Sequence, residues 1–204
     1  MAAGDTDIAL CSRALTLLGA SAISSFSDGT DASSTCSRLY ESIKTALLTM
    51  YPWKFATKKV QLARLVSTPV NEWTYAYQLP GDLLAMDALF NTSAVGAQPL
   101  LSGWERYEDT ILTDETEVYI DYRFDPEEAA YPPYFVMLLI YVLCMHLAEP
   151  ITEQVTKAQY WGNLAFGSPQ ENGRGGYFRQ ASHADARGVP VDYIRDFPLV
   201  SVRN

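Results

Sequence analysis

The sequence predicts an α+β fold: a helix bundle with an inserted small antiparallel β-sheet or sandwich and an extended C-terminal arm. Apolar residues recur every three to four positions before residue 53 and after residue 131, which is typical of helices. Between residues 54 and 124 they alternate, which is typical of half-buried strands. These changes divide the chain into N-terminal bundle helices (1–53), a β-rich insertion (54–130), C-terminal bundle helices (131–187) and an arm (188–204).

Two amphipathic helices are predicted in the first segment, over residues 5–18 and 30–50. Asp5 or Thr6 can cap the first helix, and Gly19 can end it. The apolar stripes are Ile8, Cys11, Leu15 and Leu18 in the first helix and Cys36, Leu39, Tyr40, Ile43, Ala46, Leu47 and Met50 in the second.

The junction between helix and strand falls in the stretch "YPWKFA", which contains Pro52, Trp53 and Phe55. Proline disfavours the α conformation in the residue before it, so Pro52 should end the second helix. Trp53 and Phe55 then stand where the bundle meets the sheet. We expect these two aromatic side chains to anchor that junction.

The inserted segment shows three stretches with a period of two, "VQLARL", "WTYAYQL" and "VYIDYRF". Turn signals separate them, including Pro80-Gly81-Asp82 and Ser102-Gly103. Consecutive short strands with tight turns favour antiparallel pairing. The segment is therefore predicted to form a small antiparallel sheet or sandwich.

A third helix is predicted to start at Pro132-Pro133 and to end before Pro150, and Thr152 is a candidate cap for a fourth. Its apolar run, 135–147, is 13 residues long, whereas a membrane span needs roughly 18 or more. It therefore indicates a buried helix and no membrane contact. A glycine-rich loop (167–176), a short helix and the arm follow. The arm's apolar docking residues would be Val189, Tyr193, Ile194, Phe197, Leu199 and Val200.

Cysteine and histidine are too few and too irregularly spaced to form a recognisable site. Cys11, Cys36 and Cys144 each lie in an apolar helical pattern, which indicates reduced core thiols rather than disulfides. His146 is predicted to be a core or interface residue, and His183 to be solvated. The sequence therefore predicts no metal site, no cofactor and no nucleophilic catalytic motif.

Charge is distributed unevenly along a chain of formal net charge −9. Residues 105–128 hold ten acids and two bases, a net of −8, which disfavours sequence-specific DNA binding. Residues 54–64 hold only basic charges. We expect the basic residues of one subunit to meet the acidic residues of the next, or the acids to line a channel. The basic set is Lys54, Lys58, Lys59 and Arg64, and the acidic set is Glu105, Glu108, Asp109, Asp114, Glu115 and Glu117.

An alternative function is hydrolysis of cell-wall or other polysaccharides. The stretch "WERYED", residues 104–109, mixes carboxylates with aromatic residues, as sugar-cleaving clefts do. The same composition is also found on solvated sheet edges. The sequence alone leaves both interpretations open.

Several stretches, taken in order, resemble the tailed-phage head-to-tail adaptor family, also called tail tubular protein A in short-tailed phages. They are "CSRALTLLGA", "ISSFSDGTDAS", "YPWKFA", "QLARL", "WTYAYQLPGDLL", "VYIDYRFDP", "YPPYF" and "LAEPITE". The resemblance covers most of residues 5–155, and the pairing of PW-x-FA with a later Y-x-LP-x-D contributes most of it. The glycine-rich loop 167–176 departs from the family's more continuous helix.

The resemblance implies a structural virion protein rather than an enzyme. Members form a ring, typically of twelve copies, between the portal protein above and the tail nozzle or tube protein below, often with tail fibres attached. Double-stranded DNA passes through the ring without sequence-specific binding. The implied location is the neck of the virion, after assembly in the host cytoplasm, and the arm is expected to dock on the portal or on a neighbouring subunit.

Overall fold

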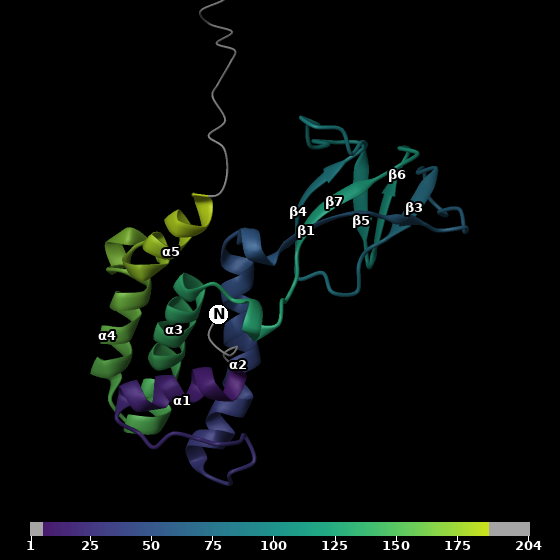
Figure 1. The fold of residues 1–204 in the computed structure, drawn as a ribbon. Coiled ribbons are helices and arrows are strands. Elements are labelled where there is room, and N and C mark those ends of the chain that lie inside the picture. Colours follow the sequence, from purple (N-terminus) through teal and green to yellow (C-terminus); the bar gives the residue numbers. More distant parts are fainter. Residues whose placement is uncertain (1–5, 188–204) are drawn as a thin grey trace, which may run out of the picture.

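The computed structural model describes residues 6–187 and shows an α+β protein with two parts, which confirms the predicted fold class (Figure 1). Five helices form a bundle, and two small antiparallel sheets project from one side of it. The arm predicted at 188–204, with its candidate docking residues, lies outside the described residues. The helices are α1 (Asp7–Leu18), α2 (Asp31–Met50), α3 (Pro133–Thr152), α4 (Val155–Phe166) and α5 (Gly176–Ala186).

The first two helices end where the sequence predicts and begin one or two residues later than predicted, at Asp7 and Asp31. Thr6 Oγ1 accepts a hydrogen bond from Ala9 N (3.2 Å), and Thr30 Oγ1 accepts one from Ser33 N (3.1 Å). Such side chains satisfy backbone donors that the first turn of a helix leaves unpaired. Gly19 ends α1 with a φ of 82°, a conformation that glycine adopts without steric cost.

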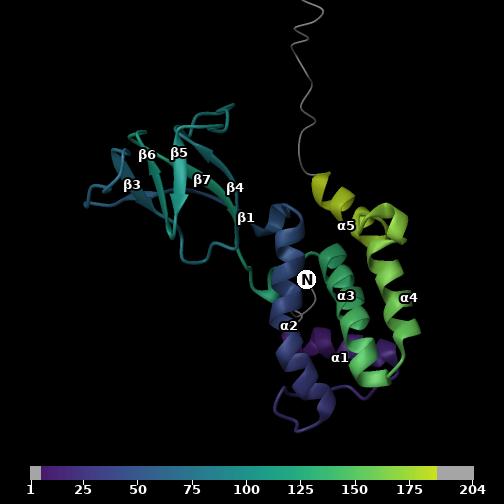
Figure 2. The same cartoon turned by 180° about the vertical axis from the view of Figure 1, so that it is seen from behind.

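Helix α3 lies at the centre of the bundle and packs against α1, α2, α4 and α5 (Figures 1 and 2). Its length and mean hydropathy of 1.8 would suit a membrane span, but 56% of its most apolar window is buried inside the fold. The residues buried on α3 include Phe135, Leu138, Leu139, Leu143 and Leu147. Its apolar composition is therefore accounted for in large part by its central position.

Two predictions about the end of α3 are wrong. Pro150 lies inside the helix, which continues to Thr152. A proline in the last turn removes only one backbone donor, and the helix then ends at Glu153 in a left-handed conformation (φ 55°). Thr152 does not cap α4, because its hydroxyl donates back to Ala148 O (2.6 Å). Gln154 occupies the cap position of α4.

The inserted segment forms two sheets, a three-stranded sheet in the order β1-β7-β4 and a four-stranded sheet in the order β2-β3-β6-β5. Both are antiparallel throughout. The strands are β1 (Thr57–Gln61), β2 (Ala63–Arg64), β3 (Tyr75–Gln78), β4 (Ala85–Phe90), β5 (Trp104–Tyr107), β6 (Thr110–Thr113) and β7 (Tyr119–Arg123).

The two sheets share a small hydrophobic core that is separate from the core of the bundle. Tyr77 and Ile111 contribute from one sheet, and Leu89 and Ile120 from the other. All four side chains are almost fully buried. The inserted segment is thus a miniature sandwich with its own core, and β1 and β7 connect it to the helices.

Candidate functional site

The junction between bundle and sheets is built around Trp53, whose side chain is completely buried. Its ring lies 5.3 Å from that of Phe135 on α3 and 5.9 Å from that of Phe178 on α5. Its indole Nε1 donates to Leu47 O (3.0 Å), so the one polar atom of the side chain is satisfied. Phe55 lies beside it at 6.1 Å, whereas Pro52 is exposed. The aromatic cluster joins α2, α3 and α5 at the point where the chain leaves the bundle.

A buried cation on α2 stabilises the second connection between the bundle and the sandwich, which is the segment after β7. Lys44 on α2 is only 4% exposed, and its Nζ lies 2.7 Å from Asp125 Oδ2 and 3.4 Å from Glu128 Oε1. Glu41 Oε2 lies at 3.1 Å. Burial lowers the pKa of the Lys44 ammonium, but hydrogen bonds to Asp125 and Glu41 outweigh that effect and raise the pKa above its ordinary value. The charge network therefore fixes the segment after β7 against α2.

A buried carboxylate attaches α5 to the junction. Asp185 is 6% exposed, and its two oxygens accept hydrogen bonds from Tyr134 OH (2.7 Å) and Lys54 N (2.8 Å). Burial, followed by the hydrogen bond to Asp185, raises the pKa of the Tyr134 hydroxyl. One side chain thus links α5 to α3 and to the start of the β-region.

Replacing Asp185 by alanine is expected to lower the free energy of unfolding by about 2 kcal/mol, because two partly buried hydrogen bonds lose their charged acceptor. Asp185→Asn retains one acceptor oxygen and should lose roughly half as much. Urea denaturation followed by circular dichroism measures both values. Equal stability of Asp185→Ala and the wild type would contradict the role assigned to this carboxylate.

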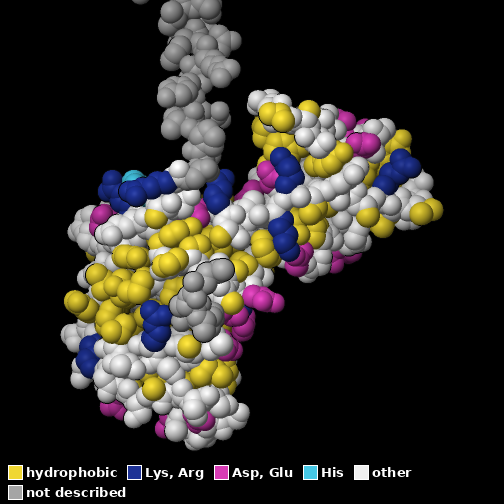
Figure 3. All heavy atoms as spheres, in the orientation of Figure 1, with side chains coloured by type: hydrophobic (Ala, Val, Ile, Leu, Met, Phe, Trp, Pro, Cys, Tyr) yellow, Lys and Arg dark blue, Asp and Glu magenta, His cyan; other side chains and the backbone are white. Residues whose placement is uncertain are grey.

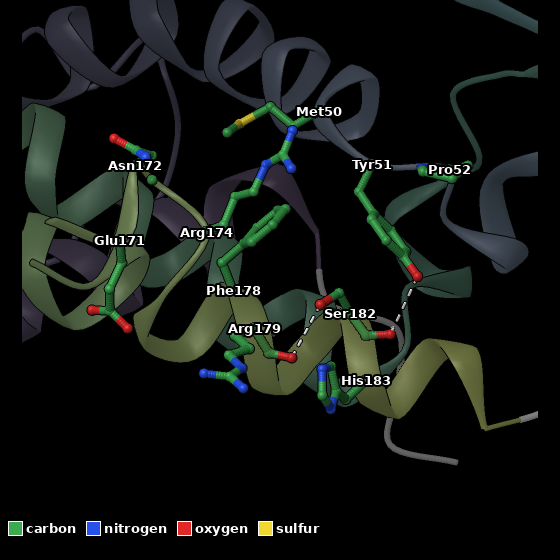
Figure 4. Close-up of a pocket in the computed structure, with 11 residues that line it drawn as sticks. Met50, Tyr51, Pro52, Glu171, Asn172, Arg174, Phe178, Arg179, Ser182 and His183 are labelled. Carbon is green, nitrogen blue, oxygen red and sulfur yellow. Dashed lines mark hydrogen bonds between the residues drawn. The ribbon is translucent and has the colours of Figure 1, made fainter. Parts of the chain in front are cut away.

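A cavity of about 840 Å³ opens between the end of α2, helix α5 and the loop before α5, and we call it the α2–α5 pocket (Figure 4). Its apolar lining comes from Met50, Tyr51 and Phe178, and its cationic lining from Arg174 and Arg179. In Figure 4, Arg174 reaches across the pocket towards Met50. Within the described part of the chain, neither arginine forms an ion pair.

The loop before α5 is shaped by close backbone packing. A Cβ on Gly176 would lie 2.6 Å from Gly167 N, and one on Gly175 would lie 2.3 Å from the carboxyl carbon of Glu171. Glu171 in turn accepts a hydrogen bond from Ser168 N (2.9 Å). This carboxylate is therefore used inside the loop, and Figure 4 shows it pointing away from the Arg174 guanidinium. The glycine-rich stretch thus shapes one wall of the α2–α5 pocket.

The basic residues predicted for a subunit contact have mixed surroundings. Lys58 Nζ lies 2.8 Å from Asp82 and 3.7 Å from the centre of the Phe124 ring. Lys59 Nζ lies 3.4 Å from Asp121 and 4.0 Å from the Phe90 ring. Both cations therefore have partners within the inserted β-region of their own chain, and reversing their charges would weaken that region as well as any contact between subunits. Lys54 and Arg64 are exposed, and Arg64 lies over the ring of Tyr75.

The predicted acidic residues are divided between two places rather than one face. Glu105, Glu108 and Asp109 lie on β5 and in the β5–β6 turn, and all are exposed. Asp114, Glu115 and Glu117 follow β6, which is four residues long, so they lie roughly 13 Å from Glu108 and Asp109, at the end of the strand where Glu105 pairs with Leu112. The division follows from strand geometry, which separates residues that are close in sequence.

The hydrolase interpretation requires two carboxyl groups facing each other across a sugar-binding cleft. Glu105 instead accepts a hydrogen bond from Trp73 Nε1 (3.2 Å) on an exposed strand. Asp109 lines a small cavity of about 190 Å³ together with Arg106. This function stays a prediction, and no specific contact favours it.

Large apolar side chains gather on the face of the bundle seen in Figure 3, over α3 and α4. Leu17 on α1 is 49% exposed, and Tyr160 on α4 is 61% exposed. Val155 and Leu164, also on α4, are exposed on opposite flanks of that helix, since nine residues turn it by about 180°. An apolar cavity of about 300 Å³, lined by Leu17, Met137 and Ile140 among others, lies between α1 and α3. We call this region the apolar bundle surface.

The cysteines match their prediction, since all three are buried free thiols. His146 does not lie in the core but is exposed on α3, because the helix turns that position away from its neighbours. His183 is exposed on α5 and lines the α2–α5 pocket. Among the described residues, no cluster of three or more potential metal ligands is present.

The α2–α5 pocket is the feature that sequence reasoning missed. Met50 was predicted to lie on the buried stripe of α2, but it is 52% exposed and lines the pocket. The only local signal was the arginine within "GRGG", followed five residues later by Arg179. A scan against protein-family models finds no match to this chain, and a search of curated proteins finds no matching relative.

Proposed function

We propose that this chain is a structural head-to-tail adaptor of tailed-phage virions that assembles into a ring between the portal and the tail nozzle. The observation that carries the proposal is that the bundle leaves several large apolar side chains of α1 and α4 exposed, namely Leu17, Val155, Tyr160 and Leu164. Uncovered apolar surface of this kind marks an interface with another protein. The motifs that resemble the adaptor family support the same assignment, since "YPWKFA" forms the buried junction around Trp53.

The distribution of charge suits a protein whose copies contact one another and together surround DNA. Carboxylates on the sandwich repel phosphates, so DNA would slide past them without being held. The sandwich projects from the bundle, so each copy presents two distinct surfaces to its neighbours (Figure 1). In this proposal about twelve copies form the ring, with the portal above and the nozzle or tube protein and tail fibres below.

Co-expression with the portal protein from the same genome tests the proposal. We expect a monomer or weak oligomer when the chain is expressed alone and a ring when the portal is present, observed by mass photometry and negative-stain imaging. Leu17→Asp should reduce ring formation at least tenfold, because it places a charge on the apolar bundle surface. Val66→Asp is the matched control, since Val66 is fully exposed on the sandwich. Absence of both ring formation and portal binding in the wild type would overturn the proposal.

A further inference from the structure

The α2–α5 pocket combines an apolar lining with two arginines that form no ion pair within residues 6–187. Met50 is 52% exposed there, and the neighbouring Phe178 supplies an aromatic wall. Arg174 and Arg179 bring two positive charges into a protein whose formal net charge is −9. A ligand matched to such a pocket would present an apolar or aromatic side chain beside carboxylates.

The β5–β6 turn of the sandwich offers that combination. Tyr107 is 61% exposed and is followed by Glu108 and Asp109, both exposed. Residues 105–109 hold three acids and one base, Arg106, for a net charge of −2. The turn thus presents an exposed aromatic side chain, followed directly by two carboxylates.

Two hydrogen bonds restrain the turn, one within it and one from the residue that follows β3. Thr110 Oγ1 donates to Tyr107 O (2.7 Å), and Leu79 N donates to Asp109 O (2.9 Å). Glu108 has a left-handed φ of 51°, which places it at the tip. An ordered turn loses little conformational entropy on binding, which favours its use as a contact.

The turn cannot reach the pocket of its own chain in this structure. Figures 1 and 2 both show β5 and β6 on the far side of the β1–β7–β4 sheet from the bundle. The pocket lies on the bundle, between α2 and α5. A contact between them must therefore join two molecules, and it would use different surfaces on each.

We propose that the β5–β6 turn of one copy docks into the α2–α5 pocket of the next, with Tyr107 against the apolar lining and Glu108 and Asp109 beside Arg174 and Arg179. This inference rests on the proposed self-assembly of the chain and names one of its contacts. A head-to-tail contact between unlike surfaces closes into a ring when the rotation between copies permits. Opposite charges beside an aromatic anchor fix the register of such a contact.

Disulfide trapping between two full-length variants tests the contact. Glu108→Cys on one copy, which keeps Tyr107 and Asp109, and Ser182→Cys, in the pocket, on another are mixed at high concentration with a mild thiol oxidant. The native cysteines are buried, so the new thiols should dominate the reaction. We expect the mixed dimer to form at least tenfold more than with Val66→Cys, an exposed control on another loop of the sandwich. A yield equal to that control would overturn the inference.

Charge reversal supplies the second measurement. Arg179→Glu in the Ser182→Cys copy should reduce trapping at least tenfold, and Asp109→Arg in the Glu108→Cys copy should restore it. Circular dichroism checks that each variant folds. An unchanged yield with Arg179→Glu would also overturn the inference. If rings form with the portal and the charge reversals do not change their yield, this contact alone is disproved. Trapping without ring formation or portal binding would support the contact and disprove the adaptor function.

Discussion

Replacing Trp53 by alanine is expected to lower the free energy of unfolding by about 3–5 kcal/mol. The side chain is fully buried and contacts aromatic residues from α3 and α5, so its removal leaves a large cavity where three helices meet. The loss also leaves Leu47 O without the indole donor. For a chain of this length the melting temperature should fall by roughly 10 °C. Thermal and urea denaturation followed by circular dichroism measure the two quantities.

Trp73→Ala is the matched control for this substitution. Trp73 is only partly buried, and its indole donates to the exposed carboxylate of Glu105. Trp73→Ala should lower the free energy of unfolding by less than about 1 kcal/mol. Similar losses for the two substitutions would show that Trp53 does not anchor the junction.

Lys44→Ala should lower the free energy of unfolding by about 2–3 kcal/mol. The substitution leaves the carboxylates of Asp125 and Glu128, which are partly buried, without their cation. Lys59→Ala is the control, because the Lys59 side chain is 50% exposed and its pairing with Asp121 should contribute at most about 1 kcal/mol. Urea denaturation at neutral pH compares them. A loss no larger for Lys44 than for Lys59 would contradict the stabilising role of the network.

The same network predicts how stability depends on pH. The pKa of Lys44 is raised in the folded state, so its contribution is fully present below the unfolded pKa of 10.5 and is lost as the pH rises through the folded pKa. The difference in stability between wild type and Lys44→Ala should be constant from neutral pH to about pH 10 and shrink above it. A difference that shrinks between pH 7 and 9 would contradict this sign.

The helices were predictable because their signals are local. Thr6, Gly19 and Thr30 act within one turn of the helices they delimit. Strands β4 and β6 were missed for different reasons. β4 contains an irregularity between Met86 and Ala88 that breaks its alternation, and β6 is buried at nearly every position, so it shows no period of two.

The candidate site was less predictable because its members come together only in the fold. Met50 and Arg174 line one pocket although more than a hundred residues separate them in sequence. Lys59 finds Asp121 because the two face each other across the β1–β7 pairing, and such a register cannot be read from either stretch alone. Composition showed that the charges were unevenly distributed, but not which of them were already neutralised.

The way the sandwich joins the bundle has a mechanical consequence. Thr57 opens β1 and Arg123 closes β7, and these two residues face each other at the bundle end of the sheet. Tension between the sandwich and the bundle therefore pulls β1 and β7 in the same direction. The backbone hydrogen bonds between these two strands are then not sheared. Because the sandwich is inserted between α2 and α3, force applied at residues 6 and 187 has to separate those helices before it can stretch a single strand. The sandwich should thus be the last part of the molecule to yield.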